Sequence, residues 1–348
     1  MFFSISMPVY NAENYLNKSI GSVMRQTEQD FELILVNDGS KDNSLSICYE
    51  WQKKYPNIIR VIDKENSGSL FTRRVCLKES KGHYLYIMDA DDYLTDSNML
   101  KIIKEKIVEF KSDLLLFNSS KDENNVSSIF KFPFKKDNII EDKNKIYNLL
   151  LTSHCLNPLW DKVFSRNLVD WEIDYSDYKC VTHATDAFQS LPILVKANRI
   201  LYLDNVFYHY TIEENSQSIV HTYKKTIYDS FKERHKRLSD LSKSWHNIEQ
   251  KDLLIKNSFM NDVKEYYLRT LKVHDNNELL KLYRTISEDS YFRKNYNLKG
   301  NTFFTKIIVS LFYHKRIYIL MYINPLLKYL NISKLYYLYV RAKKQLLI

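Results

Sequence analysis

The chain has 348 residues, of which 45% are hydrophobic and 27% charged, a globular balance that excludes a disordered or collagen-like protein. Only five residues are glycine, so a glycine-rich phosphate loop is excluded as well. The net charge of +9 is uneven, because residues 221–348 hold 25 Lys and Arg against 11 Asp and Glu. This asymmetry predicts a basic module that meets an anionic partner, either nucleic acid or a membrane surface.

The four cysteines form no CxxC pair and have no metal-ligand spacing, which is typical of a reducing compartment. We recognise no signal peptide and no uninterrupted apolar stretch of about 18 residues. We therefore expect a cytoplasmic protein, either soluble or peripheral on the inner face of the plasma membrane.

The first 120 residues alternate short apolar runs with segments of helical periodicity. The apolar runs predict strands at Phe2–Met7, Phe31–Val36, Ile58–Ile62, Tyr84–Met88 and Leu114–Asn118. The periodic segments predict helices at Glu13–Gln26, Asp42–Tyr55, Ser69–Glu79 and Asn98–Phe110. This order predicts an α/β fold with a mostly parallel sheet and helices on both faces. Such sheets bind ligands beyond the carboxyl ends of their strands.

The pattern changes twice further along the chain. Residues 121–150 are polar, with an edge strand expected at Ser127–Phe132. Residues 151–220 predict a strand at Leu159–Ser165, a helix at Asp186–Ala197, and strands at Ile200–Leu203 and Val206–Tyr210. From about Thr222 the pattern is helical, so we expect a domain boundary near residue 220.

An acidic cluster, Asp89-Ala90-Asp91-Asp92, directly follows the fourth predicted strand. Three carboxylates in four residues repel one another unless a cation lies between them. A hard divalent cation that also binds a diphosphate would relieve this repulsion. The alternative is a helix N-cap provided by Asp92 or Asp96.

A second polar turn, Asp38-Gly39-Ser40, follows the second predicted strand. A carboxylate here can accept the imide N–H of a uracil base, and Tyr10, just past the first strand, can stack on the same base. The alternatives are a plain Asx turn for Asp38 and an ordinary surface tyrosine for Tyr10.

These strand exits resemble family-2 glycosyltransferases of the GT-A fold. The matching motifs occur in order over residues 8–94: Pro8-Val9-Tyr10-Asn11, Phe31-Glu32-Leu33-Ile34-Leu35-Val36-Asn37-Asp38-Gly39-Ser40, Asn66-Ser67-Gly68 and Met88-Asp89-Ala90-Asp91-Asp92. A weaker resemblance continues to about residue 220 through Trp160-Asp161-Lys162-Val163-Phe164 and Asp186-Ala187-Phe188. The chain departs from the family pattern at Thr185, where Glu is usual, and at Arg73-Arg74-Val75-Cys76, where Arg-Asn-x-Gly is usual. We interpret Arg74 as a solvated helix residue, and the alternative is a second contact with the diphosphate.

The resemblance implies a metal-dependent, inverting transfer of a hexose from a UDP-sugar to a hydroxyl of a growing surface glycan. The hexose would be galactose, glucose or an N-acetylhexosamine, and the glycan a capsule or exopolysaccharide intermediate or a protein-linked chain. The implied nucleotide-binding residues are Pro8, Tyr10, Asp38, Arg73 and Asp89. Asp89 and Asp91 would hold Mn²⁺ or Mg²⁺, and Asp186 would deprotonate the acceptor hydroxyl.

Weaker candidates for contacts with the acceptor or the donor sugar are Trp160, Lys162 and His183. A Trp on an apolar strand and a lone His are more often structural than functional. The resemblance divides the chain into a catalytic domain of residues 1–220 and a basic, helical domain of residues 221–348. Residues 1–120 would form the nucleotide-binding half of the catalytic domain, and residues 121–220 the acceptor half.

The basic C-terminal region supports two interpretations. Segments Phe303–Ile323 and Leu326–Val340 combine aromatic and aliphatic residues with Lys and Arg and contain no acid, a pattern typical of an anionic membrane interface. The alternative is a helical bundle that packs on the catalytic domain. Nucleic acid is not expected, because no recognition motif accompanies the charge. For the whole chain, the rival to an enzyme is a non-catalytic module that binds sugar nucleotides or a partner protein.

Overall fold

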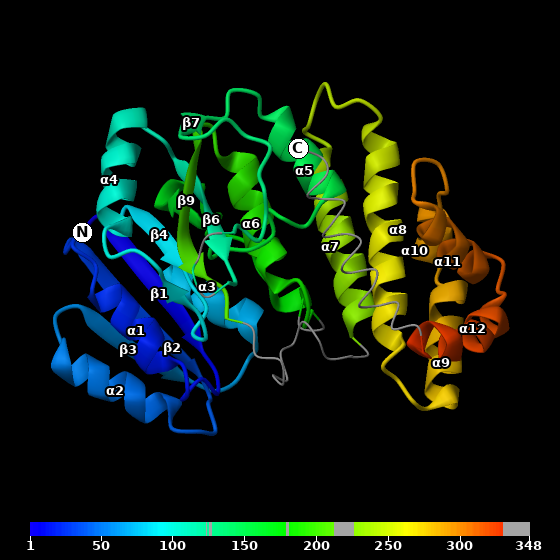
Figure 1. Cartoon of the computed structure of the whole chain (residues 1–348), viewed down its shortest axis with the longest axis horizontal. Coiled ribbons are helices and arrows are strands. Elements are labelled where there is room, and N and C mark those ends of the chain that lie inside the picture. Colours follow the sequence, from blue (N-terminus) through cyan, green and yellow to red (C-terminus); the bar gives the residue numbers. More distant parts are fainter. Residues whose placement is uncertain (123, 125–126, 179–180, 212–225, 330–348) are drawn as a thin grey trace. The chain divides into compact units, whose positions relative to one another are not determined.

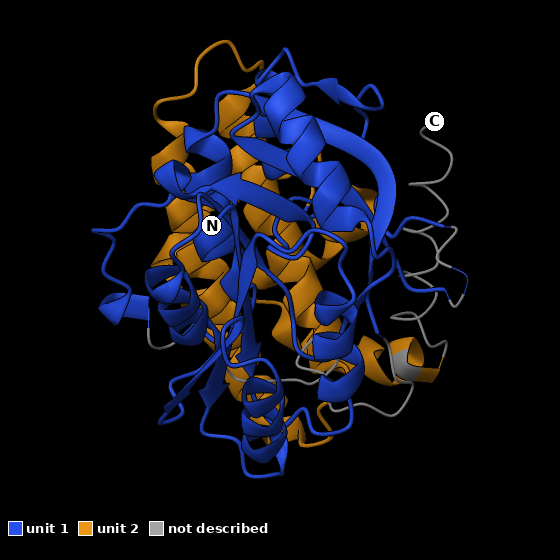
Figure 2. Ribbon diagram, turned by 90° about the vertical axis from the view of Figure 1, so that its left-hand side faces the viewer, with its two compact units in different colours: residues 1–150, 154–216 blue, residues 151–153, 217–348 orange. Residues whose placement is uncertain are grey.

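The computed structural model describes residues 1–122, 124, 127–178, 181–211 and 226–329. The chain divides into two compact units, residues 1–150 with 154–216 (unit 1) and residues 151–153 with 217–348 (unit 2) (Figure 2). The domain boundary expected near residue 220 lies outside the described residues.

Unit 1 is built on one mixed sheet (Figure 1). Its strands are β1 (Phe3–Val9), β2 (Phe31–Asp38), β3 (Ile59–Lys64), β4 (Tyr84–Ile87), β5 (Tyr93–Leu94), β6 (Leu114–Ser120), β7 (Asn138–Ile139), β8 (Lys162–Ser165) and β9 (Ile200–His209). They follow the order β3-β2-β1-β4-β8-β6-β9-β5, and β7 pairs with β9. Strands β1 to β4 pair in parallel, as do β6 and β9, whereas β5, β7 and β8 run antiparallel to their neighbours. The predicted α/β fold is therefore confirmed.

Helices cover both faces of this sheet, and successive side chains of β1 point alternately to the helices on one face and to those on the other. Its residues Phe3, Ile5 and Met7 are fully buried in the large core that also takes side chains from α1 (Leu16–Met24), α2 (Ser44–Lys54) and α4 (Met99–Phe110). Its residues Ser4 and Ser6 point the other way, where α3 (Ser69–Glu79) packs on β1 and β2. Helix α6 (Thr185–Lys196) packs against α3. Unit 1 also contains two short helices, Arg166–Leu168 and Ser176–Tyr178, and most of α5 (Asn144–Thr152).

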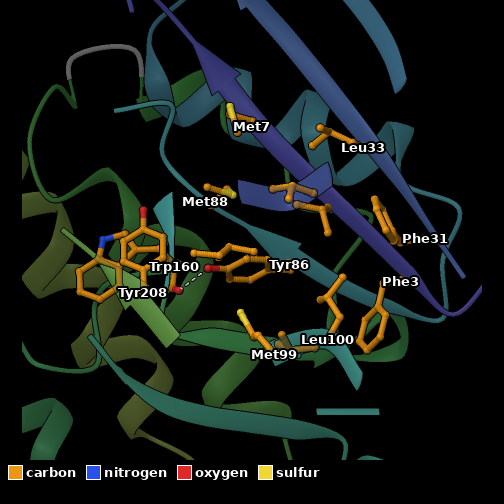
Figure 3. Packing of buried hydrophobic residues seen from close by; sticks show 14 of the residues in the cluster. Phe3, Met7, Phe31, Leu33, Tyr86, Met88, Met99, Leu100, Trp160 and Tyr208 are labelled. Atoms are coloured by element: carbon orange, nitrogen blue, oxygen red, sulfur yellow. Dashed lines mark hydrogen bonds between the residues drawn. The ribbon is translucent and has the colours of Figure 1, made fainter. Parts of the chain in front are cut away.

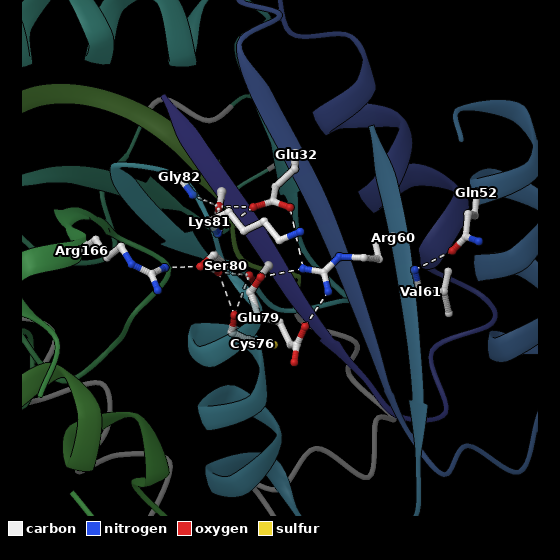
Figure 4. Close-up of polar contacts among 12 residues, drawn as sticks. Glu32, Gln52, Arg60, Val61, Cys76, Glu79, Ser80, Lys81, Gly82 and Arg166 are labelled. Carbon is white, nitrogen blue, oxygen red and sulfur yellow. Dashed lines mark hydrogen bonds and ion pairs between the residues drawn. The ribbon is translucent and has the colours of Figure 1, made fainter. Parts of the chain in front are cut away.

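A polar network next to β1 explains one of the five glycines (Figure 4). The hydroxyl of Ser4 donates to Oε1 of Glu32 at 2.6 Å and accepts from the backbone N–H of Gly82 at 2.7 Å. A Cβ atom at residue 82 would lie 2.5 Å from the backbone nitrogen of Ser4, so only glycine fits here. Glu32 also lies 3.8 Å from Arg60, which links β3 to this network.

An aromatic cluster ties β4, β9 and the turn before β8 together (Figure 3). The ring of Trp160 stacks on Tyr208 with a centroid distance of 4.9 Å, and the hydroxyl of Tyr86 donates to the carbonyl oxygen of Trp160 at 3.0 Å. Only 6% of Trp160 is exposed. This packing holds β8, which runs antiparallel to its neighbours, in place beside the parallel strand β4.

Four predicted strands differ from the structure. No strand is found at Ser127–Phe132, where a single bridge joins Ser120 to Ser128, because aromatic contacts of Phe132 with Tyr202 hold this segment instead of a ladder. The strand predicted from Leu159 begins only at Lys162, because residues 159–162 form a turn. The two strands predicted between residues 200 and 210 form one strand, β9, whose pairing with β6 shifts register near Asn118.

Unit 2 is helical in the part of it that the structure describes, as predicted. It comprises α7 (Ile227–Ser242), α8 (Lys251–Thr270), α9 (Asn276–Glu288), α10 (Ser290–Asn295), α11 (Phe303–Tyr313) and α12 (Ile317–Tyr329). These helices bury one hydrophobic core of their own. The apolar run Phe303–Ile323 forms parts of two helices, α11 and α12, because Lys315 between them has a φ of 55°, which is not helical. Residues 330–340 of the second basic segment lie outside the described residues. Within the described residues, no helix combines the length and apolar character needed to cross a membrane.

Candidate active site

The exits of β1 and β2 are joined by Asn11. The backbone N–H of Asn11 donates to Oγ of Ser40 at 3.1 Å, and its Oδ1 accepts from the backbone N–H of Lys41 at 2.8 Å. Asn11 has a φ of 48°, a conformation that Asn tolerates better than most residues. Tyr10 precedes it and is 51% exposed, while Pro8 lies within β1 opposite Val36. The first two expected nucleotide contacts therefore lie at one edge of the sheet.

The carboxylate of Asp38 is buried and organises the loop before α3. Its Oδ1 accepts from the backbone N–H of Ser67 at 2.9 Å, and its Oδ2 accepts from that of Gly68 at 3.0 Å. Lys64, its register partner on β3, also binds Oδ1. Asp38 thus holds the Asn66-Ser67-Gly68 loop in addition to its expected role towards uracil. Lys64 was not predicted as a site residue, but the parallel pairing of β2 with β3 could have identified it as the ion-pair partner of Asp38.

The structure gives the three carboxylates that follow β4 different environments. Asp89 is partly exposed, and Arg73 binds it. Asp91 is exposed. Asp92 is buried, accepts from the Tyr208 hydroxyl at 2.5 Å and from the backbone N–H of Thr211 at 2.7 Å, and anchors this turn to β9. Burial raises the pKa of Asp92 well above its usual range, and the neighbouring carboxylates add to the effect. Asp92 thus holds the turn in place, whereas Asp89 and Asp91 reach the protein surface in part or in full.

The guanidinium of Arg73 connects two carboxylates from distant parts of the chain. Its Nη2 donates to Oδ1 of Asp89 at 2.8 Å, and its Nη1 lies 2.7 Å from Oδ1 of Asp186. Arg73 is 7% exposed. Burial acts to lower its pKa, but Asp186 and Asp89 raise that pKa above the usual value, so the guanidinium stays charged. The resemblance implies that Arg73 faces the nucleotide or its diphosphate, and this stays a prediction; in the structure both of its terminal nitrogens bind protein groups.

Asp186 lies in the first turn of α6, and its carboxylate faces Arg73. The N-cap position of this helix belongs to Ala184, which has a φ of 54°, so Asp186 does not serve as the N-cap. Burial raises the pKa of Asp186, while Arg73 opposes this rise. A carboxylate with a raised pKa accepts a proton more readily, as a general base requires.

Thr185 fits into the same network, although the family pattern usually has Glu at this position. Its hydroxyl accepts from Nη1 of Arg73 at 3.0 Å and lies 3.0 Å from the hydroxyl of Ser69. Helices α3 and α6 are therefore joined near their N-termini by the neutral hydrogen bond between Ser69 and Thr185 as well as by the contacts of the Arg73 guanidinium.

The weaker candidates lie in less accessible positions. Trp160 is enclosed by its aromatic neighbours, and none of the Lys162 surface is exposed. His183 is partly buried in the bend before α6. Arg74, predicted to be a solvated helix residue or a second diphosphate contact, is 7% exposed; its Nη2 donates to the carbonyl oxygen of Trp171 at 2.5 Å. The prediction of a solvated side chain was wrong, because the rings of residues 171 and 175 cover this guanidinium.

The donor set is compatible with a metal ion that arrives with its substrate. Among the described residues, no group of three or more His, Cys, Asp or Glu side chains is arranged to hold a metal. Asp89 and Asp91 offer carboxylate oxygens at one turn, and Mg²⁺-type sites often use one or two carboxylates together with substrate phosphates. The residues therefore fit such an ion, bound jointly with a diphosphate.

Comparisons with known proteins agree with this architecture. Residues 4–166 match the model of Glycosyl transferase family 2. The chain is 29% identical over 241 residues to glycosyltransferase GlyA of Streptococcus pneumoniae and 28% identical over 230 residues to the minor teichoic acid biosynthesis protein GgaB of Bacillus subtilis. These alignments cover 66% and 64% of this chain but only 34% and 24% of the two relatives, so the chain spans at most about a third of their length.

The fold has a solved counterpart. The structure of S. aureus TarS 1-349 in complex with UDP-GlcNAc superposes with a TM-score of 0.63 and 23% sequence identity, covering 84% of this chain and 81% of that chain. This similarity confirms the GT-A fold. Residues 4–166 thus carry a domain similar to glycosyltransferase family 2, and relatives that align with this part of the chain are named glycosyltransferases.

Proposed function

We propose that unit 1 is a metal-dependent, inverting glycosyltransferase that moves a hexose from a UDP-sugar to a hydroxyl of a growing surface glycan. One observation carries the proposal: a single buried guanidinium, that of Arg73, binds both Asp89 at the strand exit and Asp186 at the start of α6. A diphosphate-binding carboxylate and a general base must lie close together for direct displacement at the anomeric carbon.

The proposed reaction is a single displacement. The acceptor oxygen forms a bond to the anomeric carbon while the bond from that carbon to the diphosphate oxygen breaks. The hydroxyl proton passes to the Asp186 carboxylate, and UDP leaves with the bonding electrons. Attack opposite to the leaving group inverts the anomeric configuration. Burial of Asp186 supports its role, because the raised pKa makes this carboxylate the stronger proton acceptor.

Pro8, Tyr10 and Asp38 are proposed to hold the uridine at the exits of β1 and β2. The exposed ring of Tyr10 is available for stacking. Asp89 and Asp91 would hold Mn²⁺ or Mg²⁺ together with the diphosphate, and the bound ion would neutralise the charge that grows on the leaving group. A UDP-sugar donor is further supported by the UDP-GlcNAc bound to the similarly folded TarS.

The acceptor is proposed to be a cell-surface polymer or its precursor, since one relative is named for teichoic acid biosynthesis. An acceptor built at the cytoplasmic side of the membrane would favour an enzyme that binds an anionic membrane surface. Seven exposed apolar or aromatic residues on α11 and α12 support such binding, and we refer to them as the aromatic face: Phe303, Ile307, Tyr318, Ile319, Tyr322, Leu326 and Tyr329. The cations Lys306, Lys315 and Arg316 on and between these helices are exposed as well.

A donor panel tests the proposal. Full-length protein is incubated with UDP-galactose, UDP-glucose and UDP-N-acetylhexosamines in the presence of Mn²⁺, and release of UDP is measured with and without candidate acceptors. Hydrolysis or transfer with at least one donor is expected. Inertness towards every donor, combined with no binding of UDP, would instead favour the non-catalytic module.

A further inference from the structure

A lysine at the end of β3 lies against the proposed uridine site and has no part in the binding described above. Lys64 is the last residue of β3, and its register partner is Asp38, the last residue of β2. Its ammonium binds Oδ1 of Asp38 and donates to the carbonyl oxygen of Glu65 at 2.5 Å and to Oγ of Ser67 at 2.7 Å. An ammonium has three N–H donors, so protein groups occupy all of them. Lys64 is therefore not placed to bind a ligand directly.

The hydrogen bonds of Asp38 leave its carboxylate with room for one more donor. Oδ1 accepts from Lys64 and from the backbone N–H of Ser67 at 2.9 Å, and Oδ2 accepts from that of Gly68 at 3.0 Å. A carboxylate can accept about four hydrogen bonds, so the remaining position is on Oδ2. All three partners are donors, and the carboxylate therefore acts as an acceptor only. A group that binds at Oδ2 must bring an N–H or an O–H of its own.

The loop before α3 holds this carboxylate in one orientation. Nδ2 of Asn66 donates to the carbonyl oxygen of Asp38 at 2.8 Å, in addition to the two backbone contacts on the carboxylate. Gly39, which has a φ of 67°, lets the loop come this close, because a Cβ atom at this residue would lie 2.9 Å from the backbone nitrogen of Asn66. Only 4% of Asp38 is exposed. Lys64 supplies the counter-charge that such a buried carboxylate requires.

We propose that Lys64 is a positioning residue for recognition of the nucleobase, which fills Oδ1 of Asp38 and directs Oδ2 towards the N3–H of uracil. The inference rests on the proposed contact between Asp38 and uracil. Uracil brings the N–H that Oδ2 can accept, whereas cytosine has a lone pair at N3 that the carboxylate repels. Lys64 thereby contributes to the choice of a UDP-linked over a CDP-linked donor without touching the nucleotide.

The charge of Lys64 matters as well as its hydrogen bond. Without the ammonium, the buried carboxylate of Asp38 would lack a counter-charge, and such a group takes up a proton more readily. A protonated carboxyl group can donate to N3 of cytosine, so the preference for uracil would be lost in part. The ratio of the affinities for the two nucleotides therefore reports on Lys64 more specifically than either affinity alone.

Calorimetry with UDP and CDP tests the proposal. Full-length protein in the presence of Mn²⁺ is expected to bind UDP more tightly than CDP. Lys64→Met removes the ammonium but keeps an apolar side chain, so UDP binding is expected to weaken while CDP binding stays the same or tightens. The ratio of the two dissociation constants should change at least about threefold in favour of CDP. Lys64→Arg, which keeps the positive charge, is expected to restore much of the preference for UDP.

Lys232→Met is the matched control, because the side chain of Lys232 is 20% exposed, as is that of Lys64, and pairs with Asp289 of unit 2 at 2.8 Å. It is expected to leave the ratio unchanged. A purely structural role of Lys64 would weaken the binding of both nucleotides by the same factor, and that outcome overturns the inference. If Lys64→Met does not fold, Lys64→Gln, which keeps N–H donors without the charge, decides by the direction in which the ratio changes.

Failure of the proposed uridine site gives a different result from failure of this inference. Equal affinity of the unaltered protein for UDP and CDP, or no binding of either, would refute the uridine site itself. A preference for UDP that Asp38→Asn reduces and Lys64→Met leaves intact would refute the role of Lys64 alone.

Discussion

Nη1 of Arg73 lies 2.7 Å from Oδ1 of Asp186, and the same guanidinium binds Asp89 through Nη2 at 2.8 Å. The proposed base and the proposed metal ligand therefore share one buried cation. A change in charge at either carboxylate is felt by the other through Arg73, since the guanidinium between them is buried and water screens the two pairs only in part. This shared partner also offsets the repulsion between the two carboxylates.

The first prediction concerns Asp186. Asp186→Asn keeps the size of the side chain but removes its negative charge and its ability to take the acceptor proton. Transfer is expected to fall at least about a hundredfold, while UDP affinity stays near that of the unaltered protein. The melting temperature is expected to fall, because the buried guanidinium of Arg73 loses one of its two carboxylate partners. Because Ala184 is the N-cap of α6, loss of a cap does not contribute.

Glu172→Gln provides the control for this change, because Glu172 is an exposed carboxylate in the preceding segment. It is expected to transfer sugar at the normal rate. Near-normal transfer by Asp186→Asn would remove Asp186 from the reaction and leave Asp174, Asp177 or His183 as the next candidates.

The second prediction concerns the metal ion. Asp91→Asn replaces an exposed carboxylate by a neutral amide that cannot balance a divalent cation, so most of the metal-stimulated turnover should be lost. Turnover is measured over a Mn²⁺ titration of EDTA-treated protein, with Asp240→Asn as a control on an exposed carboxylate of unit 2. Full transfer by EDTA-treated protein without added metal would show that the metal assignment is wrong.

The third prediction concerns base preference. Asp38 can accept the N3–H of uracil, which cytosine lacks, so calorimetry should show tighter binding of UDP than of CDP. Asp38→Asn should reduce this difference and also lower the melting temperature, because the carboxylate binds the Ser67 and Gly68 amides. Asp63→Asn is the control, since Asp63 pairs with Asn37 on the same strand pair. Equal affinity of the unaltered protein for both nucleotides contradicts the prediction.

The fold could be predicted because its local signals agree with its tertiary structure. Strands β1, β2 and β6 are buried along almost their entire length, so they appear in the sequence as continuous or alternating apolar runs. The edge region around Ser127–Phe132 lacked such a signal, and its structure depends on aromatic contacts with β9. Its conformation could not be predicted from local pattern.

The candidate site was predictable in part for a similar reason. Asp38, Asp89 and Asp91 could be placed at one edge of the sheet because they lie at or just after the carboxyl ends of parallel strands, whereas their roles stay predictions. The binding of Arg73 to two carboxylates and the burial of Lys162 could not be foreseen, because each depends on segments that are distant in sequence. A charged residue in a sequence gives no indication of which partner will enclose it.

The fourth prediction concerns the aromatic face of α11 and α12. Co-sedimentation with vesicles should rise with the fraction of anionic lipid and fall with salt, since each basic residue near such a surface contributes about 1 kcal/mol. Replacing Tyr318 and Tyr322 by Ser, or Lys315 and Arg316 by Gln, should weaken binding several-fold. Tyr49→Ser, at an exposed tyrosine of α2, should not. Absent or salt-insensitive binding would favour the interpretation of the C-terminal region as a packed bundle.

The fifth prediction concerns a buried histidine in unit 2. His235 of α7 is 1% exposed; its Nδ1 lies 2.7 Å from the hydroxyl oxygen of Tyr291 and its Nε2 lies 3.0 Å from the carbonyl oxygen of Ile255. A carbonyl oxygen can only accept, so Nε2 carries a proton. Burial lowers the pKa of His235 to about 4, so the imidazole is neutral at pH 7 and its Nδ1 then accepts from the Tyr291 hydroxyl.

Acid should therefore destabilise the protein through this residue. In the unfolded chain a histidine titrates near pH 6.5, so between about pH 6.5 and 4 the unfolded state binds a proton that the folded state does not. The stabilising contribution is complete above pH 6.5 and is lost as the pH falls towards 4, by up to about 3 kcal/mol. Urea unfolding of the full chain at several pH values should show this dependence, and His235→Gln should flatten it. His246→Gln, at an exposed histidine, should leave it unchanged. If the free energy of unfolding of His235→Gln falls with decreasing pH as steeply as that of the unaltered protein, another group causes the acid sensitivity.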